Sequence, residues 1–451
     1  MGTKTKFFLI SFYLVSFCCL SQNTFIPDDS FEQVLIDLGL DSGPLDDFVP
    51  TSNITPLTSL DLSFDTTGLI ISDLTGIEDF TSLNQLFIQN NQLTSVDVSS
   101  NTNLQILWCF NNQLSNLNVS QNPKLISLRC EDNLLTSLDT LNNINLNVLI
   151  CERNNLSTLN VSNNTGLSRL QYGSNNLTNL DVRNNTNLSY LSCQQNNITT
   201  LNVENNSKLT TLLCFENIIS ALNLSNNFNL TEIDCSNNTL CSLNLNNGNN
   251  TNITSINFEF NPDLNCVVVD NPDTDHTTWQ PSNFANYVNS NEACSDFIPV
   301  DNLDTVFVTS YTLPTLNNGN YFTGPNGMGT ALNAGSIING TQTIFIYNQT
   351  SCYSNQTSFS VIINNEDYFI PKYFTPNNDG INDVWQVYDR LNLVNNISIY
   401  NRYGKLLKFL PNTTIGWDGT YNGQILNSDS YWYEIILNSK EVLRGYFTLK
   451  R

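Results

Sequence analysis

The sequence is poor in positive charge and in the residues that most often carry chemistry. Among 451 residues it has one histidine, His276, and 17 Lys and Arg against 40 Asp and Glu, a formal net charge of -23. Such an acidic chain repels phosphate backbones, so no nucleic-acid partner is expected. Paired-histidine metal motifs, nucleophile elbows and phosphate-binding glycine loops are absent from the sequence. We expect no enzyme activity, metal or cofactor. A catalytic site among carboxylates such as Glu131 and Glu152 is an alternative, with solvated acidic surface as the plainer interpretation.

Long apolar runs are also missing, with one exception at the N-terminus. Two lysines precede the run from Phe7 to Leu20, a pattern typical of a secretory signal peptide, which we assign to residues 1–21. The run is too short for a convincing membrane anchor, so the mature chain is expected to have no transmembrane segment. Cys18 and Cys19 leave lipid attachment open, although Phe17 stands where such a site requires a small residue.

The chain does contain a repeat of 21 residues. Six cysteines follow one another at multiples of this spacing, and the missing member of the series is Tyr172. The column is therefore expected to be buried and apolar, with reduced thiols. Its cysteines are Cys109, Cys130, Cys151, Cys193, Cys214 and Cys235. An asparagine repeats in the same register from Asn91 to Asn261, and we expect these amides to satisfy turn backbone and to stack on one another.

The full repeat reads L-x-x-L-x-C-x-x-N-x-L-x-x-L-x-V-x-x-N and resembles the leucine-rich repeat. The stretch D-L-T-G-I-E-D-F, Asp73 to Phe80, looks like the opening coil of internalin-like bacterial repeats. The resemblance implies a solenoid, which we assign with its C-terminal cap to residues 51–295. A single coil cannot bury its own leucine face, so both ends need caps.

Residues 22–50 are expected to form the N-terminal cap. Ser30 and Gln33 read as a capping box at the start of a short helix that ends at Gly39. The apolar face of that helix is predicted to consist of Phe31, Val34, Leu35 and Leu38.

Recognition is the function that the repeat favours. Side chains flanking the buried Leu of each strand alternate to the concave face, where aromatic residues gather. Exposed aromatic groups indicate contact with a ligand. The alternative is that Arg129 merely stacks on Trp108 and that the N-terminal cap covers Phe87. The candidate ligand-binding residues are Phe87, Trp108, Phe110, Arg129, Tyr190, Leu213 and Phe215.

The period is lost after the solenoid. Cys266 and Cys294 bracket its end, and in an oxidising compartment they are expected to form a disulfide that staples the C-terminal cap; two unpaired thiols are the alternative. Thr341–Tyr347 and Ser358–Ile363 then alternate as strands do. We predict a small immunoglobulin-like β-sandwich spacer over residues 296–365.

Residues 366–451 carry four motifs in order: F-I-P-K-Y-F-T-P-N-N-D-G-I-N-D, I-Y-N-R-Y-G-K, W-D-G-T-Y-N-G and R-G-Y-F-T-L-K-R. They resemble the gliding-motility-associated C-terminal domain, the type B sorting signal of the type IX secretion system. The matching residues are Pro376, Asn377, Asp379, Gly380, Asn382, Asp383, Asn401, Arg402, Gly404, Lys405, Trp417, Asp418, Gly419, Gly423 and Gly445.

This resemblance implies passage through the type IX secretion machinery to the cell surface or beyond. Turn signals alone predict a β domain of about seven strands here. One loop departs from the family, because Asn427 to Ser430 replace a usual Pro-Ser-Gly-Thr, and we expect a looser hairpin turn without loss of the signal. Asp379, Asn382 and Asp383 suit either turn capping or a calcium ion.

The sequence thus predicts a mainly β protein: a leucine-rich-repeat solenoid with a short helical N-terminal cap, an Ig-like β-sandwich spacer and a C-terminal β-sandwich sorting domain. We expect an extracellular or cell-surface protein that binds an unknown protein or carbohydrate ligand and acts in adhesion. The alternative is a structural stalk of the cell surface or gliding apparatus, about 40 Å long, with no ligand of its own.

Overall fold

The computed structural model describes residues 22–274, 276–363, 367–411, 413 and 416–451. The signal peptide expected at residues 1–21 lies outside this range. The chain divides into two compact units: one holds the residues up to Pro262 together with Val269–Ala285, and the other holds Asp263–Val268 and Asn286–Arg451. Within the described residues, no helix is both long enough and apolar enough to cross a membrane.

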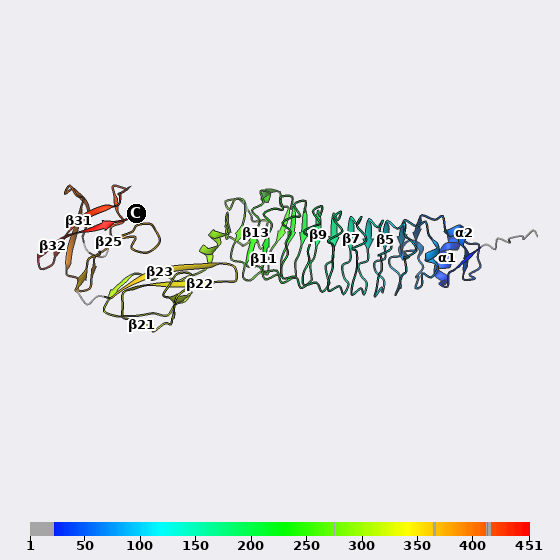
Figure 1. Ribbon diagram of the computed structural model, residues 1–451, viewed down its shortest axis with the longest axis horizontal. Coiled ribbons are helices and arrows are strands. Elements are labelled where there is room, and N and C mark those ends of the chain that lie inside the picture. Colours follow the sequence, from blue (N-terminus) through cyan, green and yellow to red (C-terminus); the bar gives the residue numbers. More distant parts are fainter. Residues whose placement is uncertain (1–21, 275, 364–366, 412, 414–415) are drawn as a thin grey trace, which may run out of the picture. The chain divides into compact units, whose positions relative to one another are not determined.

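The first unit is a β-solenoid whose coils lie side by side (Figure 1). Each coil contributes one three-residue strand to a parallel sheet of ten strands, in the order β14-β12-β10-β9-β8-β7-β6-β5-β4-β3. The strands are β3 (Ser59–Asp61), β4 (Gln85–Phe87), β5 (Ile106–Trp108), β6 (Ser127–Arg129), β7 (Val148–Ile150), β8 (Arg169–Gln171), β9 (Tyr190–Ser192), β10 (Thr211–Leu213), β12 (Glu232–Asp234) and β14 (Ser255–Asn257). On another side of the last coils, β11 (Ala221–Asn223) pairs in parallel with β13 (Ser242–Asn244).

The 21-residue repeat produces this sheet because each strand pairs in register with the strand one coil later. Leu107 of β5 lies beside Leu128 of β6, for example, and both are fully buried. The cysteine column is also fully buried, Tyr172 included, and its six thiols are free. The prediction of a buried, reduced column is confirmed.

The predicted asparagine column holds neighbouring coils together, but through backbone rather than by stacking amides. In one repeat, Asn154 Oδ1 accepts from Leu135 N at 2.9 Å, and Asn154 Nδ2 donates to Cys130 O at 3.0 Å and Cys151 O at 3.2 Å. The expectation of amide stacking was wrong. Backbone groups of two coils point at each amide, and they satisfy its hydrogen-bonding capacity, so the amides do not bond to one another.

A second asparagine column, the last position of the repeat pattern, was given no role in the sequence analysis. Its Nδ2 atoms donate to two carbonyls of the preceding coil; Asn143, for example, reaches Val119 O and Asn122 O, both at 2.9 Å. The members are fully buried: Asn101, Asn122, Asn143, Asn164, Asn185, Asn206 and Asn227. Side-chain hydrogen bonds from two asparagine columns thus join each coil to its neighbour.

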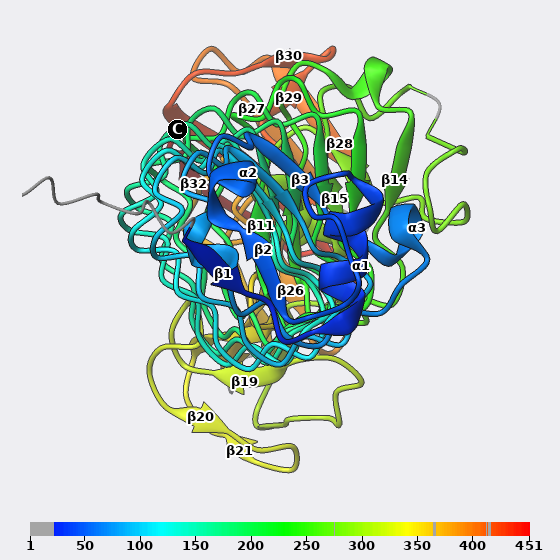
Figure 2. The same cartoon turned by 90° about the vertical axis from the view of Figure 1, so that its right-hand side faces the viewer.

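The N-terminal cap lies over the first coil, as the view from that end shows (Figure 2). It contains β1 (Asn23–Phe25) paired antiparallel with β2 (Phe48–Pro50), and the helices α1 (Asp29–Asp37), α2 (Thr51–Ile54) and α3 (Phe64–Thr67). A 3-10 turn, η1 (Ile77–Asp79), follows Gly76, whose φ of 100° and closeness to Phe25 O leave no room for a Cβ.

Two details of the predicted cap were wrong. The residue that caps α1 is Asp28, whose Oδ1 accepts from Phe31 N at 3.0 Å, so Ser30 lies inside the helix and Gln33 donates to Asp37 instead. Leu38 is 56% exposed rather than buried, because it lies at the C-cap. The remaining predicted apolar residues are buried, and Gly39 ends the helix at φ 71°.

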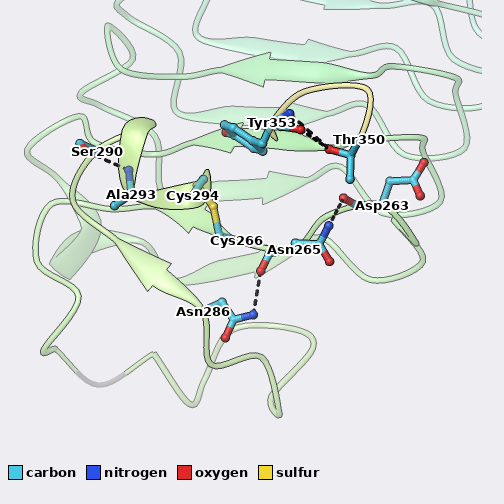
Figure 3. The surroundings of a disulfide bond; sticks show 9 residues. All are labelled: Asp263, Asn265, Cys266, Asn286, Ser290, Ala293, Cys294, Thr350 and Tyr353. Carbon is cyan, nitrogen blue, oxygen red and sulfur yellow. Dashed lines mark hydrogen bonds between the residues drawn. A yellow bond between two sulfur atoms is a disulfide. The ribbon is translucent and has the colours of Figure 1, made fainter. Parts of the chain in front are cut away.

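The second unit begins with a short parallel pair, β15 (Val267–Val268) and β16 (Tyr287–Val288). Cys266 and Cys294, with Cα atoms 5.7 Å apart, are joined by a disulfide (Figure 3). Cys294 lies in the 3-10 helix η3 (Glu292–Phe297), and the disulfide packs with Val268, Val288 and the partly buried Tyr353.

The following strands form a five-stranded sheet in the order β17-β23-β22-β19-β20 and a two-stranded sheet, β18-β21. Their buried residues, among them Ile344, Ile346 and Phe359, form one core. The strands are β17 (Val306–Val308), β18 (Tyr311–Thr312), β19 (Asn320–Phe322), β20 (Ala331–Leu332), β21 (Ile337–Ile338), β22 (Gln342–Gln349) and β23 (Ser354–Ile363). The predicted segment Ser358–Ile363 lies within β23, and the segment Thr341–Tyr347 lies within β22 except for Thr341, which precedes that strand.

The C-terminal region has nine strands among its described residues rather than seven, since several short turn segments pair. Its main sheet runs β25-β32-β31-β27-β28, with Trp385, Trp417 and Phe447 in the core beneath it. The strands are β24 (Tyr368–Phe369), β25 (Tyr373–Phe374), β26 (Tyr388–Asp389), β27 (Val394–Tyr400), β28 (Leu406–Leu410), β29 (Thr420–Tyr421), β30 (Gln424–Ile425), β31 (Asp429–Leu437) and β32 (Val442–Leu449).

Candidate recognition surface

The ten-stranded sheet places the predicted ligand-binding residues on one face of the solenoid, here called the sheet face. In each strand the middle residue is buried, and in β5 to β8 both flanking residues are half-buried. This follows from the alternation of strand side chains. Residues on neighbouring strands therefore stand about 4.8 Å apart along the sheet, close enough for direct side-chain contacts.

Four of the predicted residues form a first cluster at the N-terminal end of the sheet face. The rings of Phe87 and Trp108 meet edge to face, with centroids 5.0 Å apart. The guanidinium of Arg129 lies 5.1 Å from the Trp108 ring centroid and 4.3 Å from that of Phe110. Arg129 also pairs with Glu131. The expected stacking of arginine on Trp108 is thus present, and it includes a second ring.

A second cluster lies on β8 to β10 and the residues that follow them. Here the guanidinium of Arg169 lies 3.9 Å from the Tyr190 ring centroid, and its Nε donates to Gln171 Oε1 at 2.7 Å. Leu213 and Phe215, one coil further on, are half-buried on the same face. Burial raises the pKa of Tyr190, so its hydroxyl remains protonated at neutral pH.

Between the two clusters lies a group of hydrogen-bonded polar side chains that the sequence did not reveal. It consists of Glu152, Ser192 and Gln194 and is here called the Glu152 hub. Glu152 Oε1 accepts from Ser192 Oγ at 2.8 Å and from Gln194 Nε2 at 3.2 Å, although both donors lie two coils away. The contact is possible because the intervening coil has Gly173, where a Cβ would stand 2.3 Å from Gln194 Nε2. The sequence signal for this contact was Gly173, the glycine in a repeat column of larger side chains.

Two carboxylates of this face, Glu131 and Glu152, are not solvated. Glu131 is 3% exposed and Glu152 is 7% exposed, so the interpretation of the pair as acidic surface was wrong. Arg129 covers the first, and the hub side chains cover the second. Hydrogen bonds and an ion pair offset part of the cost of burying these charges.

His276, the one histidine, is packed into its own loop rather than presented to solvent. It is 8% exposed, its ring centroid lies 4.3 Å from that of Trp279, and Nε2 is 3.1 Å from Thr274 Oγ1. The contacts of this side chain are those of a buried packing residue.

In the C-terminal domain, most of the predicted motif residues shape turns. Asp383 accepts from the backbone N of Asn377, Asn378 and Gly380 at 2.9, 2.6 and 2.8 Å. Asn378 adopts φ 64°, a left-handed conformation that asparagine tolerates better than most residues. Both Asp383 oxygens are thus engaged in turn capping, the first of the two roles expected for this loop.

Other motif residues have packing roles. Gly445 lies under the Tyr433 hydroxyl, where a Cβ would stand 2.3 Å away. Trp417 is buried, and its Nε1 donates to Thr420 O at 2.8 Å. Asn401 Oδ1 accepts from the backbone N of Tyr403 and of Lys405, both at 3.0 Å, which closes the β27–β28 turn.

The unusual loop before Tyr431 is held by contacts of its own. Tyr431 Oη donates to Asn427 O at 2.9 Å, and Arg402 pairs with Asp429. Ser428 Oγ accepts from the backbone N of Arg451 at 2.8 Å. These contacts hold the loop although its sequence contains neither Pro nor Gly.

Comparisons with known proteins agree with this architecture. Residues 368–449 match the family model described as CHU_C Type IX secretion signal domain. A comparison with curated proteins gave no significant match.

Similar solved structures include two proteins of Listeria monocytogenes. One is the functional domain of InlJ, which includes a cysteine ladder: identity is 23%, the match covers 76% of this chain and 99% of that one, and the TM-score is 0.48. The other is an internalin, inlF, with 18% identity, 54% and 84% coverage and a TM-score of 0.40. The chain thus combines a β-solenoid, built on a 21-residue leucine repeat, with a C-terminal match to the type IX secretion signal domain, a signal that implies export to the cell surface or beyond.

Proposed function

We propose that the exported protein is a recognition protein that binds a protein or carbohydrate through the sheet face of its solenoid. The observation that carries this proposal is the pair of aromatic–arginine clusters on one face, on either side of the Glu152 hub. Trp, Tyr and Arg are the residues that most often dominate binding energy at interfaces. Four strand spacings, about 19 Å, separate Trp108 on β5 from Tyr190 on β9. A ligand that contacts both clusters therefore has to span at least this distance.

Preorganisation supports the same proposal. The ion pair with Glu131 and the hydrogen bond to Gln171 hold the two arginines in place, and the clusters need little reordering on binding. Binding loses less conformational entropy when interface side chains are already fixed. The carboxylate and hydroxyl of Glu152 and Ser192 are buried on this face, so this pair is not presented to a substrate, and we propose adhesion without catalysis.

A structural stalk is the second candidate, and one observation favours it. The guanidinium groups of Arg129 and Arg169 already cover one side of the aromatic rings, which leaves these rings only half-exposed. In this case the clusters stabilise the sheet and have no ligand.

Binding of the mature chain, residues 22–451, to a panel of glycans and surface proteins distinguishes the two. A Trp108→Ala, Tyr190→Ala variant removes one ring from each cluster, and Phe228→Ala, which truncates a 54% exposed phenylalanine in a turn of the solenoid, is the matched control. Thermal unfolding checks that each variant folds. Recognition predicts selective binding that the double variant weakens at least tenfold and the control retains. No binding across the panel, or equal binding by both variants, contradicts it.

A further inference from the structure

The main sheet of the C-terminal domain has one face on the core and one face that carries exposed apolar side chains. Ile397, Ile435 and Phe447 point into the core and are fully buried. Directly opposed residues of antiparallel strands share a face, so Tyr400, Trp432 and its partner Tyr446 lie together on the other side. A solvated sheet face is normally polar.

This outer aromatic face exposes several apolar side chains. Trp432 is 41% exposed and Tyr446 is 67% exposed, and at the β28 edge Leu406 and Phe409 are 46% and 53% exposed. Leu406 pairs with Tyr400 in the sheet register, so these residues form one continuous surface with the central strands. Contiguous exposed apolar surface marks an interaction site.

The N-R-Y-G turn extends this face into solvent. Asn401 caps the turn and Gly404 adopts φ 77°, so between them Tyr403 projects with 85% of its surface exposed. Asn401, Arg402, Gly404 and Gly445 also line a cleft of about 330 Å³ beside Trp432 and Arg444. The motif residues at this place therefore build a surface as well as a turn.

Charge indicates the chemistry of the partner. Residues 366–451 contain nine Lys or Arg and nine Asp or Glu, so the rest of the chain carries the whole net charge of -23. Around the outer aromatic face three cations, Arg402, Lys405 and Arg444, outnumber the acids Asp429 and Glu434. A partner surface with apolar and acidic groups fits this face and is repelled by the acidic remainder of the chain.

We propose that the outer aromatic face, with Tyr403 at its tip, is the surface by which the type IX secretion machinery contacts this chain. The partner is a protein of that machinery with an apolar, acidic docking surface. The secretion signal match covers every residue of the face, which favours this occupant over a second copy of the chain.

The test is export of the full chain from a bacterium that has a type IX secretion system. A Tyr403→Ser, Trp432→Thr variant removes the aromatic ring at the tip of the face and one ring on its central strand. Ile425→Ser, 69% exposed in β30 outside this sheet, is the matched control. The proposal predicts that the fraction of chain on the surface and in the medium falls at least tenfold for the first variant and stays unchanged for the control. Export of the double variant at the unmodified level overturns it.

A cross-link in cells separates lost docking from lost folding. Tyr403→p-benzoylphenylalanine alters a side chain that packs little against its own domain, and on irradiation it is expected to give a discrete adduct with a secretion-machinery protein. An adduct only with a second copy of the chain, or none in cells that export the protein, overturns the proposal. Binding by the solenoid is independent of this face, so failure here leaves the proposed recognition function intact.

Discussion

At the scale of single residues, the solenoid repeats a strained backbone conformation once per coil. The residue before each ladder asparagine has a φ between 50° and 58°. The series is Asn90, Asn111, Asp132, Arg153, Ser174, Gln195, Glu216, Asn237 and Phe260. The sequence could not predict this row, because the turn geometry sets the conformation and residues that rarely adopt it, such as Arg153 and Phe260, occupy several places.

Because Phe260 holds this strained conformation, a substitution that suits the left-handed backbone is expected to stabilise the protein. This residue is 72% exposed and has a φ of 56°, so Phe260→Asn gives up little buried surface and suits the left-handed backbone better. We expect the free energy of unfolding in urea to rise by about 0.5–1 kcal/mol. Phe228→Asn, at an exposed position outside the positive-φ row, is expected to show no gain, and equal effects of the two substitutions would contradict this explanation.

At the scale of elements, the 21-residue period predicted the strands and the buried columns, because one pattern decides which side chain points inward in every coil. The Glu152 hub depends instead on side chains two coils apart that meet over Gly173. The capping of helix α1 also depends on a tertiary contact that a local sequence pattern does not contain. Its cap is Asp28 rather than Ser30, since Asp28 also binds the first coil, and a local capping motif contains no information about that tertiary contact.

Asp28 joins the cap to the solenoid through both carboxylate oxygens. Oδ1 caps α1, while Oδ2 accepts from Ser72 N at 2.8 Å, Ser72 Oγ at 2.9 Å and Asp73 N at 3.1 Å. Asp28→Ala is therefore expected to lower the free energy of unfolding by about 2–3 kcal/mol, more than loss of a helix cap alone. Asp29→Ala, one residue into the helix, is the control, and a similar loss from both variants in chemical denaturation would refute the bridging role.

The cysteine column gives the stability of the solenoid a defined pH dependence. Burial raises the pKa of Cys193 to about 12 and raises the pKa of the other five ladder thiols further. Unfolded thiols ionise near pH 8.5, so at higher pH the unfolded state holds fewer protons than the native state. The stabilisation is complete below this pH and is lost as the pH rises toward the native pKa.

We expect the free energy of unfolding to fall by up to about 1.4 kcal/mol per pH unit for each ladder thiol between pH 9 and 11. The measurement is urea unfolding under argon, which prevents thiol oxidation. In Cys193→Val the slope against pH should be smaller by the contribution of one thiol. An unchanged slope in this variant would mean that the thiols are not the titrating groups.

At the scale of the whole molecule, sequence motifs identified the secretion signal domain and the solenoid better than they identified the ligand. The C-terminal motifs predicted the secretion signal domain, which the family match confirms at residues 368–449. The position of the aromatic residues on the sheet face also follows from the repeat. The ligand does not, because binding depends on the shape that Arg129, Arg169 and the Glu152 hub give this face together.

Site-specific cross-linking shows directly whether the sheet face of the exported solenoid contacts a ligand. A photoreactive residue replaces Ile150, half-buried between the two clusters, or Leu134, 52% exposed in a turn away from the strands. The purified mature chain is then irradiated with intact cells or with surface extracts. Recognition by the sheet face predicts a discrete adduct from position 150 and none from position 134. Adducts from neither position, or the same adducts from both, would contradict recognition by the sheet face and favour the stalk.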